Sequence, residues 1–217
     1  MSVTSLQSKW IVSGLVATVL ILATFLSAPA RAATLLVMGD SLSAGYGIDP
    51  EDGWVSLLAQ RLDQQDASHQ VINASISGET SRGGLDRLPA LLEQHQPDLV
   101  LLELGANDGL RGYPVPRITT NLSRMIELSE RAGAEVILLG IQLPPNFGNR
   151  YTEPFFQQYA DLAEQFDLRY LPFLLEGVAL TDALMQDDGL HPTAAAQPQV
   201  LDNVWPLVAA ALSERSS

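Results

Sequence analysis

The stretch LLVMGDSLSAGYG, residues 35–47, changes character near its middle. Residues 35–38 are all apolar, which is typical of a strand buried on both faces of a parallel sheet. Gly39, Asp40 and Ser41 follow directly, so a hydroxyl stands just beyond the end of this strand. Ser41 can cap the next helix, or it can be a nucleophile held at the edge of a sheet. The rest of the chain decides between the two.

Short apolar runs of the same kind alternate with helical patterns along the chain. The apolar runs predict strands at residues 34–39, 70–74, 98–104, 135–141 and 169–172. Apolar residues at helical spacing predict helices at about 53–65, 84–95, 116–131, 155–166 and 193–213. Strands that alternate with helices and are apolar throughout predict a parallel sheet covered on both faces. We therefore expect one α/β domain with three layers, α/β/α, around a five-stranded parallel sheet.

The first 32 residues differ from the rest of the chain. A lysine precedes an apolar run at residues 10–26, and the small residues of SAPARAA follow. This order predicts a secretory signal peptide that is cleaved after Ala30 or Ala32. An uncleaved membrane anchor is the alternative, because the run approaches the length of a bilayer span. We assign residues 1–32 to the signal peptide and 33–217 to the domain, and expect a periplasmic or secreted protein.

The composition of the chain excludes several kinds of site and partner. The 217 residues include no cysteine, which excludes disulfides, a thiol nucleophile and a thiolate metal site. Basic and acidic residues number 12 and 25, and cleavage after Ala32 removes two basic ones, so the mature charge is 10 − 25 = −15. Such a protein is repelled by nucleic acid and by anionic membranes. We expect a monomer with a small-molecule substrate, no metal and no cofactor.

Several polar or small residues stand just beyond predicted strands. Ser41 follows the first strand, Gly78 the second and Asn107 the third, while Asp188 and His191 come after the last. Open parallel sheets bind their ligands at the carboxyl ends of the strands. We therefore expect these five residues to lie side by side.

The residue types at this edge suit nucleophilic catalysis. A serine hydroxyl needs a base that removes its proton. Of the chain's three histidines, only His191 follows the carboxyl end of a strand, and we interpret His69 and His95 as solvated surface residues. Asp188 lies three residues before His191, a spacing that lets its carboxylate reach the imidazole Nδ1. The expected catalytic residues are therefore Ser41, Asp188 and His191.

Attack on a carbonyl carbon also needs donors for the developing oxyanion. The expected donors are the backbone N–H groups of Ser41 and Gly78 and the side-chain amide of Asn107. Gly78 has no side chain, so its N–H can approach the substrate closely. We interpret Asp40 as a partner of loop N–H groups and Asp108 as the residue that positions Asn107. The chain has no G-x-S-x-G elbow, which excludes the common α/β-hydrolase architecture.

Four short blocks carry the expected site: GDSLS at 39–43, SGET around Gly78, GAND at 105–108 and DGLH at 188–191. In order and spacing they resemble the four blocks of the SGNH, or GDSL, hydrolases. Longer stretches, such as NASISGETS and ELGANDGLRG, resemble the bacterial periplasmic acyl-CoA thioesterase and lysophospholipase branch of that family, which also includes arylesterases. The resemblance implies a flavodoxin-like fold, no cofactor, and hydrolysis of acyl esters and thioesters through an acyl-enzyme. With it, Ser41 is interpreted as the nucleophile.

Two long connections, residues 105–116 and 142–154, leave the same edge of the predicted sheet. We expect their proline and glycine residues to keep both free of helix. Their apolar residues are the candidate substrate-binding residues Leu110, Tyr113, Leu143, Pro144 and Phe147. Such a wall favours medium to long acyl chains. A carbohydrate acetylesterase of the same fold is the alternative enzyme, and a catalytically idle secreted binding protein is the alternative outside enzymes.

Overall fold

Five parallel strands form the centre of the molecule: β1 (Thr34–Gly39), β2 (Gln70–Asn73), β3 (Leu99–Glu103), β4 (Glu135–Leu139) and β5 (Arg169–Leu171). Their order in the sheet is β2-β1-β3-β4-β5, with every neighbouring pair parallel. The computed structural model describes residues 32–65 and 69–215, so all but the last residue of the predicted signal peptide lies outside it. The strand order reverses between β1 and β3, and the carboxyl ends of these two strands therefore open a ligand-binding crevice.

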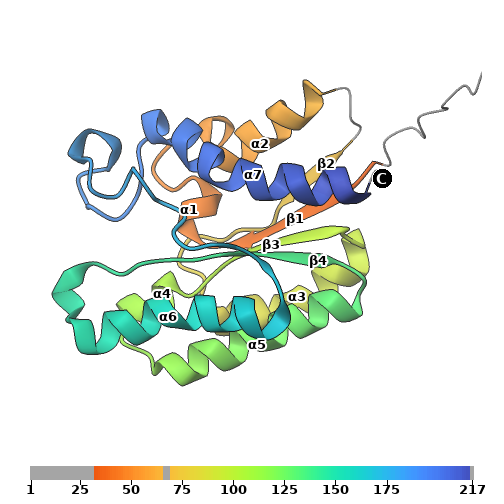
Figure 1. Ribbon diagram of the computed structural model, residues 1–217. Helices are drawn as coiled ribbons and strands as arrows, with labels where there is room; N and C mark the ends of the chain where they lie inside the picture. Colours follow the sequence, from red (N-terminus) through yellow and green to blue (C-terminus); the bar gives the residue numbers. More distant parts are fainter. Residues whose placement is uncertain (1–31, 66–68, 216–217) are drawn as a thin grey trace, which may run out of the picture.

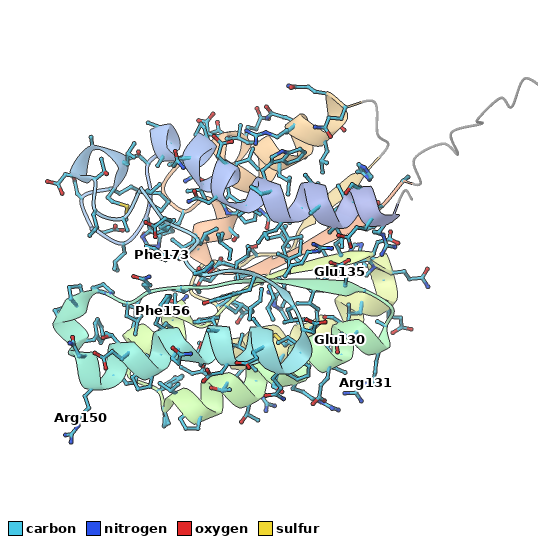
Figure 2. The ribbon with its side chains drawn as sticks, viewed as in Figure 1. Glu130, Arg131, Glu135, Arg150, Phe156 and Phe173 are labelled. Atoms are coloured by element: carbon cyan, nitrogen blue, oxygen red, sulfur yellow. The ribbon has the colours of Figure 1, made fainter. Side chains whose placement is uncertain are left out.

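Helices cover both faces of the sheet, as predicted (Figure 1). One face carries α2 (Trp54–Asp63) and α7 (Gln197–Arg215), and the other carries α3 (Ser81–His95), α5 (Val115–Arg131) and α6 (Asn149–Phe166). Side chains from both layers fill the space next to the sheet (Figure 2). Leu35 and Val37 pack on the α2 and α7 side, whereas Leu36 and Met38 pack on the opposite side. Both faces of β1 are thus buried, which explains its continuous apolar sequence.

Short helices begin where the strands end. α1 (Ser41–Ala44) follows β1 and α4 (Ala106–Leu110) follows β3, while 3₁₀ turns lie at η1 (Pro50–Asp52), η2 (Pro145–Phe147), η3 (Asp182–Leu184) and η4 (Ala194–Ala196). The expectation that residues 105–116 and 142–154 are free of helix is wrong, because α4 lies in the first and α6 begins in the second. Pro154 lies inside α6, where it removes one backbone donor but keeps a helical φ.

The amino-terminal edge of the sheet explains one of the other histidines. The Nδ1 atom of His69 accepts a hydrogen bond from the backbone N–H of Ala33 at 3.0 Å, just before β1 begins. The interpretation of His69 as a solvated residue is therefore wrong, since it holds the start of β1. Among the helices of residues 32–65 and 69–215, none combines the length and apolarity that a bilayer crossing needs.

Candidate active site

Ser41 occupies the first position of α1, directly after the central strand β1. Asp40 caps this helix, because its Oδ1 atom accepts from the backbone N–H of Leu42 at 3.1 Å. Gly39 permits the tight turn, since a Cβ there would lie 2.7 Å from atoms of both Ser43 and Glu103. The local sequence Gly-Asp-Ser therefore places the Ser41 hydroxyl at the carboxyl end of the sheet, where it lines a cavity.

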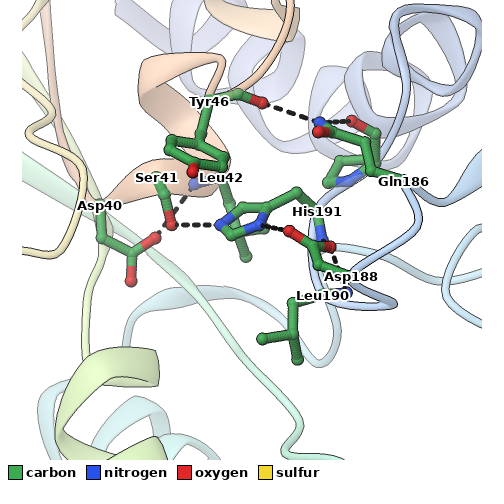
Figure 3. Close-up of polar contacts among 9 residues, drawn as sticks. Asp40, Ser41, Leu42, Tyr46, Gln186, Asp188, Leu190 and His191 are labelled. Atoms are coloured by element: carbon green, nitrogen blue, oxygen red, sulfur yellow. Dashed lines mark hydrogen bonds and ion pairs between the residues drawn. The ribbon is translucent and has the colours of Figure 1, made fainter.

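The imidazole of His191 joins the hydroxyl of Ser41 to the carboxylate of Asp188 (Figure 3). Its Nε2 atom lies 2.9 Å from Ser41 Oγ, and its Nδ1 atom lies 2.7 Å from Asp188 Oδ2. Asp188 Oδ1 accepts from the backbone N–H groups of Leu190 and His191. Burial raises the pKa of Asp188, but the hydrogen bonds from His191 and Leu190 outweigh it and lower that pKa to about 2. Asp188 is therefore ionised at neutral pH and fixes Nδ1 as the protonated nitrogen.

Two residues that the sequence did not single out hold the His191 loop against α1. The ring of Tyr46 lies 4.5 Å from the imidazole, centroid to centroid. The side-chain amide of Gln186 donates to the carbonyl oxygens of Tyr46 and Pro192, at 2.8 and 3.0 Å. The backbone N–H of Gln186 also donates to the carbonyl of His191 at 2.7 Å. Gln186 thus connects the segment that follows Ser41 to the loop that carries His191 (Figure 3).

Gly78 and Asn107 line the same cavity as Ser41 and His191. Gly78 has φ +80°, and a Cβ at this position would meet no atom within 4 Å. The backbone conformation, rather than lack of space, is thus the reason for glycine. The Nδ2 atom of Asn107 donates to Asp40 Oδ2 at 3.1 Å. Because this contact uses one hydrogen of the amide, the second hydrogen remains for a ligand.

Asp108 has a different role from the one expected. Its carboxylate accepts from the backbone N–H and the hydroxyl of Ser81, both at 2.7 Å, and Asn121 donates to the same hydroxyl at 2.9 Å. Asp40, not Asp108, positions Asn107, since neighbouring residues of a helix point in different directions. Asp108 instead ties α4 to the start of α3, a few residues after Gly78.

A second buried carboxyl group, that of Glu103, lies close to Asp40 and Ser43. Glu103 Oε2 accepts from the hydroxyl of Ser43 at 2.7 Å and from the backbone N–H of Asp40 at 3.2 Å. Glu103 Oε1 has no partner among the described residues. Burial, helped by the charge of Asp40, raises the pKa of Glu103 well above its usual value.

Burial also raises the pKa of Asp40, from 3.8 to about 6, against the opposing hydrogen bonds from Leu42 and Asn107. Burial therefore opposes ionisation of both carboxyl groups, and the charge of Asp40 further disfavours a charge on Glu103. The sequence signal for Glu103 is a single acid within the otherwise apolar strand DLVLLEL.

The cavity above Ser41 has a volume of about 300 Å³, and its lining is mostly apolar. The apolar side chains that line it include Leu110, Ile141, Leu143, Pro144, Phe173, Leu175 and Leu190. An adjoining cavity of about 400 Å³ shares Leu143, Pro144 and Phe173 with it. Of the five candidate substrate-binding residues, Leu110, Leu143 and Pro144 line the first cavity, whereas Tyr113 and Phe147 line neither. No group of His, Asp and Glu in the described part of the chain is suited to hold a metal ion.

Comparison with known proteins gives a consistent set of matches. The GDSL-like Lipase/Acylhydrolase family matches residues 37–197. Esterase TesA of Pseudomonas aeruginosa is 52% identical over 83% of this chain and 90% of its own length. Thioesterase 1/protease 1/lysophospholipase L1 of Escherichia coli K12 is 49% identical over 84% of this chain and 86% of its own. A crystal structure of the psychrotrophic esterase EstA from Pseudoalteromonas, inhibited by monoethylphosphonate, has a TM-score of 0.80 and 44% identity, covering 83% of this chain and 99% of that one.

Proposed function

The chain belongs to the GDSL-like lipase/acylhydrolase family and is a hydrolase of esters and thioesters, and we propose that it cleaves them through an acyl-enzyme formed on Ser41. Asp188 and His191 complete the catalytic triad in this proposal. Gly78, Asn107 and the backbone N–H of Ser41 form the oxyanion hole. The observation that carries the proposal is the continuous contact from Ser41 Oγ through the imidazole to Asp188, at 2.9 and 2.7 Å.

The proposed reaction has two similar halves. His191 Nε2 takes the proton of Ser41 Oγ as this oxygen attacks the acyl carbon, and the three oxyanion donors stabilise the charge on the carbonyl oxygen. The carbon–oxygen or carbon–sulfur bond then breaks, and His191 returns its proton to the leaving oxygen or sulfur. A water molecule attacks the acyl-enzyme in the same way, which releases the carboxylic acid and restores Ser41. Asp188 stabilises the imidazolium in both halves.

We propose medium to long acyl chains as the preferred substrates. The apolar lining of the cavity supports this proposal, because each buried methylene contributes about 0.8 kcal/mol of transfer free energy. The adjoining cavity extends the same wall, and Leu143 and Pro144 line both. Related proteins carry the names arylesterase, thioesterase and lysophospholipase, which fits a site that tolerates different leaving groups. We also propose export to the periplasm through cleavage of residues 1–32, so N-terminal sequencing of the mature protein should not find Met1.

A phosphonate ester is the direct test of Ser41. Treatment of the purified protein should abolish hydrolysis of p-nitrophenyl esters, and mass spectrometry should locate the adduct on Ser41 alone. The Ser41→Ala variant should be inactive, should take up no label, and should keep the wild-type circular dichroism and melting temperature. An adduct on Ser43 or on Ser77, which lines the same cavity, would overturn the assignment of the nucleophile.

A further inference from the structure

The described residues include ten arginines, of which seven lie within ion-pair distance of a carboxylate: Arg61, Arg82, Arg87, Arg124, Arg131, Arg169 and Arg215. Arg111, Arg117 and Arg150 have no such partner within residues 32–65 and 69–215. Acidic residues outnumber basic ones 25 to 12, so most arginines in this chain meet a carboxylate. Arg111 and Arg150 lie in the two long connections, residues 105–116 and 142–154, and Arg117 directly follows the first of them.

Of these three exposed arginines, Arg111 contacts a residue that lines the catalytic cavity, Gly78. It follows α4, and one of its guanidinium nitrogens donates to the carbonyl oxygen of Gly78 at 3.1 Å. Arg117 instead lies over the ring of Tyr113, at 5.2 Å from the ring centroid. Arg150 points away from the sheet into solvent (Figure 2). Arg111 thus places a positive charge beside a proposed oxyanion donor, with further N–H groups that the contact to Gly78 does not use.

The two neighbouring cavities indicate on which side of Ser41 the leaving group lies. An acyl chain that extends into the adjoining cavity passes Leu143 and Pro144, which line both cavities, whereas Ser77 and Gly78 line the first cavity alone. The side of the site next to Gly78 is then left for the leaving group. A substrate with an anionic leaving group is repelled by most of the surface of this chain, whose net charge is −13. A guanidinium at the exit compensates locally, and its planar set of donors matches the oxygens of a phosphate.

We propose that Arg111 binds a phosphate group of the leaving group, an inference that rests on the proposed hydrolase function. Arg111 donates to the carbonyl oxygen of Gly78, the residue whose own N–H is a proposed oxyanion donor, so its guanidinium lies next to the proposed oxyanion hole. This position suits a phosphate that is a few bonds from the scissile ester, as in a glycerophosphate. It suits less well a phosphate at the far end of a pantetheine arm. The preferred anionic substrate is therefore a lysophospholipid rather than an acyl-CoA.

Two pairs of substrates with equal acyl chains test this proposal. The first is 1-octanoyl-lysophosphatidylglycerol against 1-octanoylglycerol, and the second is octanoyl-CoA against S-octanoylpantetheine. Arg111→Gln should raise KM for the lysophospholipid about fivefold, the size of one exposed charge pair, and change kcat/KM for octanoylglycerol by less than about twofold. Arg111→Lys should keep most of the wild-type KM, because it keeps the charge. Arg150→Gln, a matched unpaired arginine, should change neither substrate.

Added salt gives a second readout. The wild-type KM for the lysophospholipid should rise with sodium chloride concentration, and this rise should shrink in Arg111→Gln. An equal loss on charged and neutral substrates would overturn the proposal, because Arg111 would then act through the Gly78 loop. A loss confined to octanoyl-CoA would overturn the choice of a glycerophosphate. Absence of hydrolysis of all four substrates by the wild-type protein would refute the proposed function itself.

Discussion

Replacement of Asp40 by asparagine should separate stability from activity. In the structure, Asp40 Oδ2 accepts a hydrogen bond from the amide nitrogen of Asn107. An NH₂ group in place of this oxygen would face the NH₂ group of Asn107, so the Asn107 amide is expected to turn over and accept instead. The turn removes one oxyanion donor from the cavity. We therefore expect kcat to fall by about 10²–10³, the loss typical of one missing donor.

The same substitution should stabilise the folded protein above pH 6. The pKa of Asp40 is about 6 in the fold against an ordinary value of 3.8. An acid with a raised pKa binds its proton more tightly when folded, so the folded protein loses stability as pH rises from about 4 to above 6. This difference between the two pKa values corresponds to a loss of about 3 kcal/mol in the free energy of unfolding. Between about 1 and 2 kcal/mol of that loss occurs between pH 5 and pH 8. Asparagine cannot ionise, and the variant avoids this loss.

Urea denaturation at pH 5 and pH 8, together with esterase kinetics at pH 8, provides the test. Asp40→Asn should be more stable than wild type by a larger margin at pH 8 than at pH 5, so the difference between their free energies of unfolding should increase with pH. Asn107→Ala should reproduce the loss of kcat, and the double variant should be no worse than either single one, because both remove the same donor. A kcat within about twofold of wild type would refute the role assigned to the contact between Asp40 and Asn107. A difference in stability between Asp40→Asn and wild type that does not change with pH would refute the raised pKa of Asp40.

Two further predictions concern the base and the acyl cavity. Asp188→Asn should lower kcat by about 10⁴, because the amide favours the wrong imidazole tautomer. Asp187→Asn, at the exposed neighbouring residue, should change kcat by less than about twofold. The reverse order of the two effects in p-nitrophenyl ester kinetics would contradict the contact of Asp188 with Nδ1. Leu143→Ala should lower kcat/KM for decanoyl esters about tenfold or more and for acetyl esters by less than about twofold, since Leu143 lines both cavities. An equal loss on both esters would place the acyl chain elsewhere.

The fold was predictable because its signals are local and repeated. Each strand of the sheet is a short apolar run, and the predicted strands agree with the observed ones to within about two residues. Alternate residues of β1 enter opposite cores, which only a sheet covered on both faces allows. The start of α6 could not be predicted in the same way, because proline usually indicates the end of a helix, whereas Pro154 lies inside α6.

The candidate site residues were predictable where the type of residue and its position beyond a strand together indicate one chemical role. A serine at a strand end, a histidine with an acid three positions before it, and an asparagine in a turn indicate their roles from the sequence. The supporting residues have no such signal. Gln186 reaches Tyr46 from 140 residues away, and Glu103 accepts from Ser43 across the contact of β1 with β3. These contacts depend on how the chain folds in three dimensions, and no spacing in the sequence encodes them.

The buried carboxyl pair shows what the catalytic geometry costs in stability. Asp40 must be ionised to accept from Asn107 through one oxygen while it accepts from Leu42 through the other. That charge is held where burial disfavours it, and it raises the pKa of the neighbouring Glu103, where a second charge would be costlier still. A neutral residue at position 40 would relieve the destabilisation but lose the orientation of Asn107. If Asn107 is the oxyanion donor that we propose, the destabilised aspartate follows from the need to hold this donor fixed, as expected where function and stability compete.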